Sequence, residues 1–117
     1  MNAVNVNDVD NLNNALLQNE VSYKDSVKIL LCHKPYAFDD IAKREIDLTL
    51  SGHTHGGQVV PFKYGKFNLS FASLVSSYID GFYKIGKANL YVSRGIGTVG
   101  LPIRLNCPPE ITKITLV

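Results

Sequence analysis

The sequence has few cysteines, no long hydrophobic run and no cluster of basic residues. Its two cysteines, Cys32 and Cys107, are too few for a disulfide framework and form no C-x-x-C motif, so each is expected to be a buried thiol in a reducing compartment. The longest apolar stretches fall far short of the roughly 20 residues that cross a bilayer. The net charge is +2, and no run of lysines and arginines is longer than Lys43-Arg44. The charge distribution therefore does not indicate nucleic-acid binding.

The N-terminus is polar and rich in asparagine, which is not the pattern of a signal peptide, and a cytoplasmic location is expected. The remaining composition is that of an ordinary globular protein, because 45% of the 117 residues are hydrophobic and 19% are charged. A chain of this length fits one domain, over residues 1–117.

The first part of the chain alternates between strand and helix patterns. Residues 1–7 show a weak alternation that fits either a short strand or an irregular entry segment. Apolar residues at helical spacing predict an amphipathic helix over 9–19. The compact apolar run at 27–32 predicts a buried strand, followed by a short helix at 37–44 and a second strand at 46–50. This strand–helix–strand order predicts a parallel pair with a short crossover.

Beyond residue 58 the sequence is dominated by strand patterns. It is rich in Tyr, Phe, Val and Ser and is punctuated by glycines, which predicts short strands in a meander. The segments concerned are 59–62, 67–74, 77–84 and 88–93. A glycine-rich loop follows at 94–100, and apolar/polar alternation predicts a final strand over 111–117.

All three histidines of the chain follow predicted strands: His33 ends the first strand, and His53 and His55 follow the second. The carboxyl edge of an α/β sheet is where ligand sites form. Two residues that are two apart in an extended segment point to the same side, so His53 and His55 can serve one metal ion or one each of two. Imidazole is a good ligand for zinc and iron and a weaker one for manganese.

A less specific interpretation applies to each histidine taken alone, because a histidine at a strand end can be a hydrogen-bonded structural residue and an isolated H-x-H is weak evidence. The full string Gly52-His53-Thr54-His55-Gly56-Gly57-Gln58 is more specific, because it follows an apolar strand and lies downstream of another strand-end histidine. The glycines permit tight turns and close backbone approach.

The sequence resembles the calcineurin-like metallophosphoesterases. The resemblance rests on the G-H-x-H motif at 51–55, on Leu31-Cys32-His33-Lys34-Pro35, and on the segments 56–58, 93–97 and 102–110, which resemble one bacterial branch of the family. The resemblance implies a C-terminal half of a four-layer α/β/β/α sandwich, with strands dominant after residue 58. It also implies that His33 and His53 bind one divalent metal and His55 a second, the metals being Mn, Zn or Fe.

The family's other motifs, a D-x-H, a G-D-x-x-D and a G-N-H-D/E, do not occur in this sequence. They carry the bridging carboxylate, an asparagine ligand and a histidine thought to protonate the leaving group. No catalytic residue is therefore assigned within this chain, and we expect weak metal binding and no turnover by the chain alone. A complementing N-terminal half or a second copy of the chain would supply the rest.

Two arginines are candidates for contacts with a phosphate substrate. A guanidinium fork matches phosphate geometry, so Arg94 and Arg104 are assigned this role, with a solvated or structural arginine as the alternative. Gly95 and Gly97 either cradle an anion or only shape a turn.

Other polar and aromatic residues are assigned structural roles. Asp39 and Asp40 are expected at a helix start or on the surface, and Asp47 is excluded as a ligand because it begins a strand at the end opposite His53. Tyr78 and Tyr83 are expected in the core or at its rim.

Three functions are compared. The first is a two-metal phosphoesterase that hydrolyses phosphodiesters or pyrophosphates. The branch that the sequence resembles includes membrane-associated phosphodiesterases and pyrophosphohydrolases. The first hypothesis therefore covers a nucleotide-linked or lipid-linked substrate and membrane association of the full-length protein. The second is a non-catalytic metal-binding or assembly module that pairs with another chain. The third is an ordinary α/β domain with incidental histidines.

Overall fold

The computed structural model describes residues 13–14 and 26–117. The strand predicted over 1–7, and the helix predicted over 9–19 except for positions 13 and 14, lie outside the described residues. No helix in the described part of the chain is both long and apolar enough to cross a membrane.

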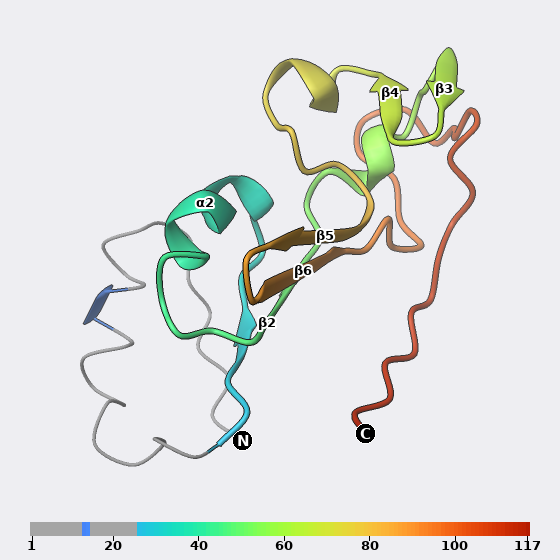
Figure 1. Cartoon of the computed structure of the whole chain (residues 1–117). Coiled ribbons are helices and arrows are strands. Elements are labelled where there is room, and N and C mark those ends of the chain that lie inside the picture. The colour runs from blue at the N-terminus through green and yellow to red at the C-terminus, as the bar shows by residue number, and fades with distance from the viewer. Residues whose placement is uncertain (1–12, 15–25) are drawn as a thin grey trace.

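The main sheet has four strands in the order β1 (Ile29–Leu31), β2 (Leu48–Ser51), β6 (Ala88–Val92) and β5 (Gly81–Ile85). β1, β2 and β6 are parallel, and β5 pairs antiparallel with β6 (Figure 1). The predicted parallel pair of the first two strands is confirmed. Because three strands run in the same direction, their carboxyl ends meet at one edge of the sheet.

One face of this sheet is covered by the segment between β1 and β2. Pro35 starts a 3-10 turn, η1 (Pro35–Ala37), because its fixed φ suits the first position of a helix. The helix α2 (Phe38–Ile41) follows and inserts Phe38 and Ile41, which are fully buried, into a core formed with Leu30, Leu90 and their neighbours. This packing holds in place the edge of the sheet where β1 and β2 end.

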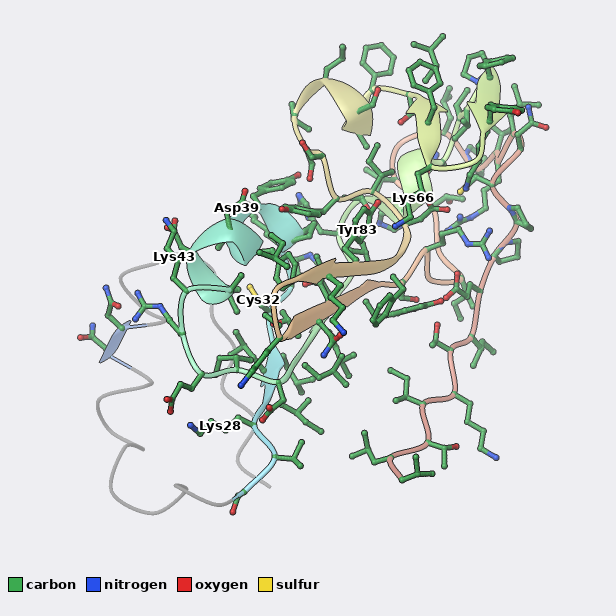
Figure 2. All side chains as sticks on the ribbon, viewed as in Figure 1. Lys28, Cys32, Asp39, Lys43, Lys66 and Tyr83 are labelled. Atoms are coloured by element: carbon green, nitrogen blue, oxygen red, sulfur yellow. The ribbon has the colours of Figure 1, made fainter. Side chains whose placement is uncertain are left out.

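A second, two-stranded sheet lies apart from the first (Figure 1). β3 (Phe62–Tyr64) and β4 (Phe67–Leu69) pair antiparallel, and Gly65 opens the turn between them with φ at 57°. The 3-10 turns η2 (His55–Gly57) and η3 (Ala72–Leu74) lie before and after this hairpin. Figure 2 shows side chains projecting outward at this end of the molecule. The exposed large apolar residues there are Phe62, Tyr64, Phe67, Leu69, Phe71, Leu74 and Val75.

Two predictions about the strands are wrong. Residues 59–93 do not form one meander, because β6 lies between β2 and β5 in the main sheet while β3 and β4 form their own hairpin. The final strand predicted over 111–117 does not form, and Ile111 is 87% exposed. Alternation suits a strand only where a neighbouring strand offers hydrogen bonds, and no described strand pairs with this segment.

The broad fold class is confirmed, because the structure is a mixed α/β fold in which four of the six described strands follow residue 58. The helix predicted over 37–44 is shorter than expected and ends at Ile41. The four-layer sandwich stays a prediction.

Candidate metal centre

His33 and His53 meet at the carboxyl edge of the main sheet. The two strands that precede them are joined beyond their ends by a hydrogen bond from the Gly52 amide to the His33 carbonyl, at 3.1 Å. His33 Nε2 and His53 Nδ1 lie 3.2 Å apart, and the two rings cross at 71°. His33 is exposed and His53 is partly buried, so this pair is open to solvent on one side.

His53 has a left-handed backbone, with φ at 68°. This conformation is uncommon for a residue with a side chain and costs on the order of 1–3 kcal/mol. The turn is closed by a hydrogen bond from the Thr54 amide to the Gly52 carbonyl at 2.8 Å. The ring of Tyr36 packs edge-on against the His53 ring at 5.6 Å. The chain thus accepts strain to hold His53 beside His33.

The pKa of His53 lies below its ordinary value. Partial burial is the largest cause, followed by the nearby charges of His33, Lys34 and His55. A lowered pKa keeps the imidazole of His53 neutral at pH 7, which is the form that binds metal ions.

His55 faces the glycine-rich loop. Its Nδ1 lies 3.3 Å from the carbonyl oxygen of Gly97. A carbonyl oxygen can only accept, so this contact is a hydrogen bond in the tautomer that carries the proton on Nδ1. In that tautomer the lone pair of the ring is on Nε2. Metal-binding histidines in proteins are oriented by this kind of contact.

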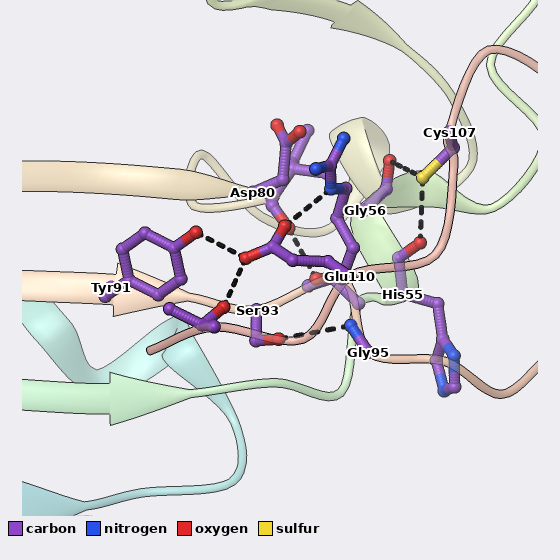
Figure 3. Close-up of polar contacts among 12 residues, drawn as sticks. His55, Gly56, Asp80, Tyr91, Ser93, Gly95, Cys107 and Glu110 are labelled. Carbon is purple, nitrogen blue, oxygen red and sulfur yellow. Dashed lines mark hydrogen bonds and ion pairs between the residues drawn. The ribbon is translucent and has the colours of Figure 1, made fainter. Parts of the chain in front are cut away.

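The loop that carries His53 and His55 is held from several segments. Thr54 Oγ1 donates to the Ile79 carbonyl at 2.5 Å in a buried contact. Cys107 Sγ lies 3.1 Å from the His55 carbonyl and 3.3 Å from the Gly56 carbonyl (Figure 3), and Asn68 Nδ2 also donates to Gly56, at 3.1 Å. The expectation that Cys32 and Cys107 are buried is confirmed.

Gln58 connects this loop to the glycine-rich loop. Its side-chain amide donates to the carbonyls of Val99 at 3.0 Å and Leu101 at 2.9 Å, and its oxygen accepts from the Val99 amide at 2.7 Å. The residues of the Gly52–Gln58 motif therefore divide between placing imidazoles and fixing the loop that carries them.

The two arginines assigned to substrate contact have hydrogen-bond partners within the chain. Arg94 Nε donates to Glu110 at 2.7 Å. Both terminal nitrogens of Arg104 donate to backbone carbonyls, which belong to His55, Arg94, Gly95, Gly97 and Cys107.

The aspartates near the histidines in sequence have other partners. Asp39 lies in the first turn of α2 and accepts from Tyr78 Oη at 2.7 Å, and Asp40 pairs with Lys43. Burial and the Asp39 contact raise the pKa of Tyr78 to about 12. Asp47 accepts from the Lys28 amide before β2, so it lies at the opposite edge of the sheet from His53. These findings agree with the sequence-based assignments.

Tyr78 and Tyr83 lie at the rim of the core, as expected. Both are partly buried, and their rings meet edge-on at 5.1 Å. Tyr83 also lies under the ammonium of Lys66, which is 5.2 Å from the ring centre (Figure 2).

The described residues contain no group of three or more His, Cys, Asp or Glu side chains that could hold a metal ion. The structure brings together two imidazoles, of His33 and His53, and places the third on the adjoining loop. Sequence reasoning missed that Tyr36 packs against His53, that Gln58 holds the glycine-rich loop, and that Glu110 pairs with Arg94. Only Gln58 carried a signal, because it directly follows the G-H-x-H-G-G string.

Comparisons with known proteins identify the relatives of this chain. The chain is 44% identical over 89 residues to the uncharacterized metallophosphoesterase YkuE of Bacillus subtilis, covering 75% of this chain and 30% of that protein. It is 35% identical over 91 residues to the phosphodiesterase YaeI of Escherichia coli, covering 77% of this chain and 32% of that protein.

A bovine relative is named a transmembrane protein with metallophosphoesterase domain. It is 36% identical over 95 residues, which cover 79% of this chain and 20% of that protein. No protein-family profile and no solved structure matches the chain. The chain belongs to the calcineurin-like metallophosphoesterases. It spans about a third or less of the length of these three relatives.

Proposed function

We propose that His33, His53 and His55 bind the divalent metal ions of a phosphoesterase. The observation that carries this proposal is the 3.2 Å separation of His33 Nε2 and His53 Nδ1. Two imidazole nitrogens bound at about 2.0–2.1 Å to one tetrahedral zinc ion lie about 3.3 Å apart. The pair thus fits two adjacent ligands of one ion without rearrangement of the strands.

His55 is proposed as a ligand of the second ion. Its Nδ1 proton is used in the contact with Gly97, so its Nε2 lone pair is the one that can bind a metal. A pair of ions would polarise the phosphoryl oxygens and supply a bound hydroxide for hydrolysis. Zinc, manganese and iron all accept imidazole ligands, and the histidines add no negative charge that would repel an anionic substrate.

The ligand set of the described residues is incomplete for such a site. No carboxylate joins the histidines in a metal-binding group within the described residues, and hydrolytic dimetal sites normally also use carboxylates. We therefore propose that further oxygen ligands come from outside these residues, and that the 117-residue chain alone binds metal weakly and does not hydrolyse phosphate esters.

The proposed substrates are phosphodiesters or pyrophosphates, including nucleotide-linked and lipid-linked ones. One relative is named a phosphodiesterase, which favours a diester. The bovine relative's name supports a membrane-associated full-length protein. Arg94 keeps its proposed role in substrate contact. The terminal nitrogens of Arg104 are occupied by carbonyls, so a different role is proposed for it below.

The test is a titration of the 117-residue chain with Mn²⁺, followed by NMR, because a paramagnetic ion broadens nearby ring signals even when it binds weakly. We expect selective broadening of the His33 and His53 ring signals at low Mn²⁺. His53→Ala should lower the affinity for Mn²⁺ at least about 10-fold, because removing even a residue that only hydrogen-bonds to a metal ligand has an effect of that size. Asp40→Asn, on the surface, is the control.

Uniform broadening, or affinity unchanged in His53→Ala, would contradict the metal proposal. A parallel assay with a phosphodiester and Zn²⁺ should show no turnover by the isolated chain. Hydrolysis that is lost in His53→Ala would support the metal site and overturn the proposed inactivity of the chain.

A second candidate, an assembly module that pairs with another chain, is supported by the exposed apolar residues of β3, β4 and η3. Phe67 is 59% exposed and Phe71 87% exposed, which is unusual for a patch with no function. Pairing predicts association that rises with protein concentration in sedimentation experiments and weakens in Phe71→Ser. A monomer at all concentrations would count against this function.

A further inference from the structure

Arg104 lies at the junction of three backbone segments. Its Nη2 donates to the carbonyls of Gly97 at 2.6 Å, Arg94 at 2.9 Å and Gly95 at 3.2 Å. Its Nη1 donates to the carbonyls of Cys107 at 3.2 Å and His55 at 3.3 Å. The Arg104 side chain is partly buried, and four of these contacts are partly buried as well, whereas the contact with Gly97 lies at the exposed side of the junction.

Two of these carbonyls belong directly to the His55 environment. The Gly97 oxygen accepts both from Arg104 Nη2 and from His55 Nδ1, at 2.6 and 3.3 Å. Arg104 also contacts the backbone oxygen of His55 itself. Arg104 thus fixes the position of the acceptor that faces the imidazole ring and the backbone to which the ring is attached.

We propose that Arg104 is a positioning residue for His55: by holding the Gly97 carbonyl, it keeps the proton on His55 Nδ1 and presents Nε2 as the metal-binding nitrogen. The inference rests on the proposed metal-binding function of His55. It extends that function by adding a residue that acts through a backbone carbonyl and touches neither metal nor substrate.

The chemistry of arginine explains why this residue type is suited to the junction. A carbonyl oxygen needs a donor, and the guanidinium offers five N–H groups in a planar fork and no acceptor. Lysine has three donors on one flexible nitrogen, so it cannot reach carbonyls on opposite sides at the same time. Gln58 holds the same loop further along, at Val99 and Leu101, whereas the side-chain contact of Arg104 is with Gly97 itself.

The test reads the tautomer of His55 directly, without metal. Long-range ¹H–¹⁵N NMR spectra of the 117-residue chain distinguish Nδ1–H from Nε2–H imidazole, at a pH about two units above the ordinary histidine pKa of about 6.5. We expect the Nδ1–H tautomer to dominate in the unmodified chain. In Arg104→Met the balance should move toward Nε2–H, which neutral histidine prefers in water, by about fivefold, the value of one hydrogen bond.

Tyr91→Phe is the control for stability, because it removes a neighbouring hydrogen bond, to Glu110, without touching Gly97. It should leave the tautomer unchanged. If Arg104→Met does not fold, Arg104→Lys should show a smaller shift in the same direction. A His55 tautomer that stays Nδ1–H in both Arg104 variants, or that is Nε2–H in the unmodified chain, overturns the proposal.

The tautomer experiment and the Mn²⁺ titration can fail separately. A tautomer shift without metal binding would support the positioning role of Arg104 and refute the metal function. Metal binding with an unchanged tautomer would refute only the positioning role.

Discussion

Replacing Gly56 by alanine is expected to lower the free energy of unfolding by about 2–4 kcal/mol. The φ of Gly56 is +63°, a conformation that side chains rarely adopt, and a Cβ here would lie 2.5 Å from Arg94 Cγ and 2.6 Å from Cys107 Sγ. Neither neighbour can move easily, since Arg94 is paired with Glu110 and Cys107 is buried. Urea unfolding followed by circular dichroism would measure the loss.

Gly65→Ala is the matched control for this prediction. Gly65 has a similar φ, +57°, but nothing lies within 4 Å of the position that its Cβ would take. Gly65→Ala should therefore lower the free energy of unfolding only by the cost of placing a side chain at a positive φ, about 1 kcal/mol. Equal losses in the two variants would mean that the close approach of Gly56 to Arg94 and Cys107 has no energetic weight.

The second large effect is expected at Glu110, which joins the C-terminal segment to the sheet. Its carboxylate accepts from Arg94 Nε at 2.7 Å and from the hydroxyls of Tyr91 and Thr112 (Figure 3). The side chains of Glu110 and Arg94 are only 13% and 25% exposed. Glu110→Gln keeps the shape but leaves the Arg94 charge without its partner, so a loss of about 2–3 kcal/mol at pH 7 is expected.

This loss should depend on pH. Burial alone would raise the pKa of Glu110, but hydrogen bonds from Thr112, Tyr91 and Arg94 lower it below its ordinary value. The charged form is therefore stabilised by folding. Its contribution is complete above the ordinary glutamate pKa of about 4.3 and disappears as the pH falls through the lowered, folded-state value.

Unfolding curves of the unmodified chain and Glu110→Gln should therefore converge below about pH 4. Asp40→Asn is the control, because Asp40 pairs with Lys43 on an exposed surface, where such pairs contribute little. A Glu110→Gln deficit that stays constant from pH 7 to pH 3 would show that the glutamate acts by shape and not by charge.

Local sequence was enough to predict the two parallel strands and the histidines at their ends. The run before His33 and the run before Ser51 are apolar, and Pro35 and Gly52 mark where regular structure stops. Both signals are local, because they depend on side-chain pattern and on backbone restrictions of single residues. The α/β class and the dominance of strands after residue 58 followed from the same signals.

The same local signals failed where a strand needs a partner. The segment 111–117 has the alternation of a strand, yet none of the described strands pairs with it. The pattern of β6 was recognised, but its place between β2 and β5 was not. Strand order depends on contacts between residues far apart in the chain, such as Leu48 with Asn89, and pattern does not encode these.

The sequence by itself determined which residue types could bind a metal and that the chain belongs with the metallophosphoesterases. Only the tertiary structure decided which nitrogens face each other, that Gly97 accepts from His55, and that Arg104 holds Gly97. The physical reason is that Gly97 and Arg104 lie more than 40 residues from His55 in the chain. A hydrogen bond depends on distance and direction in space, and folding alone brings these groups within reach.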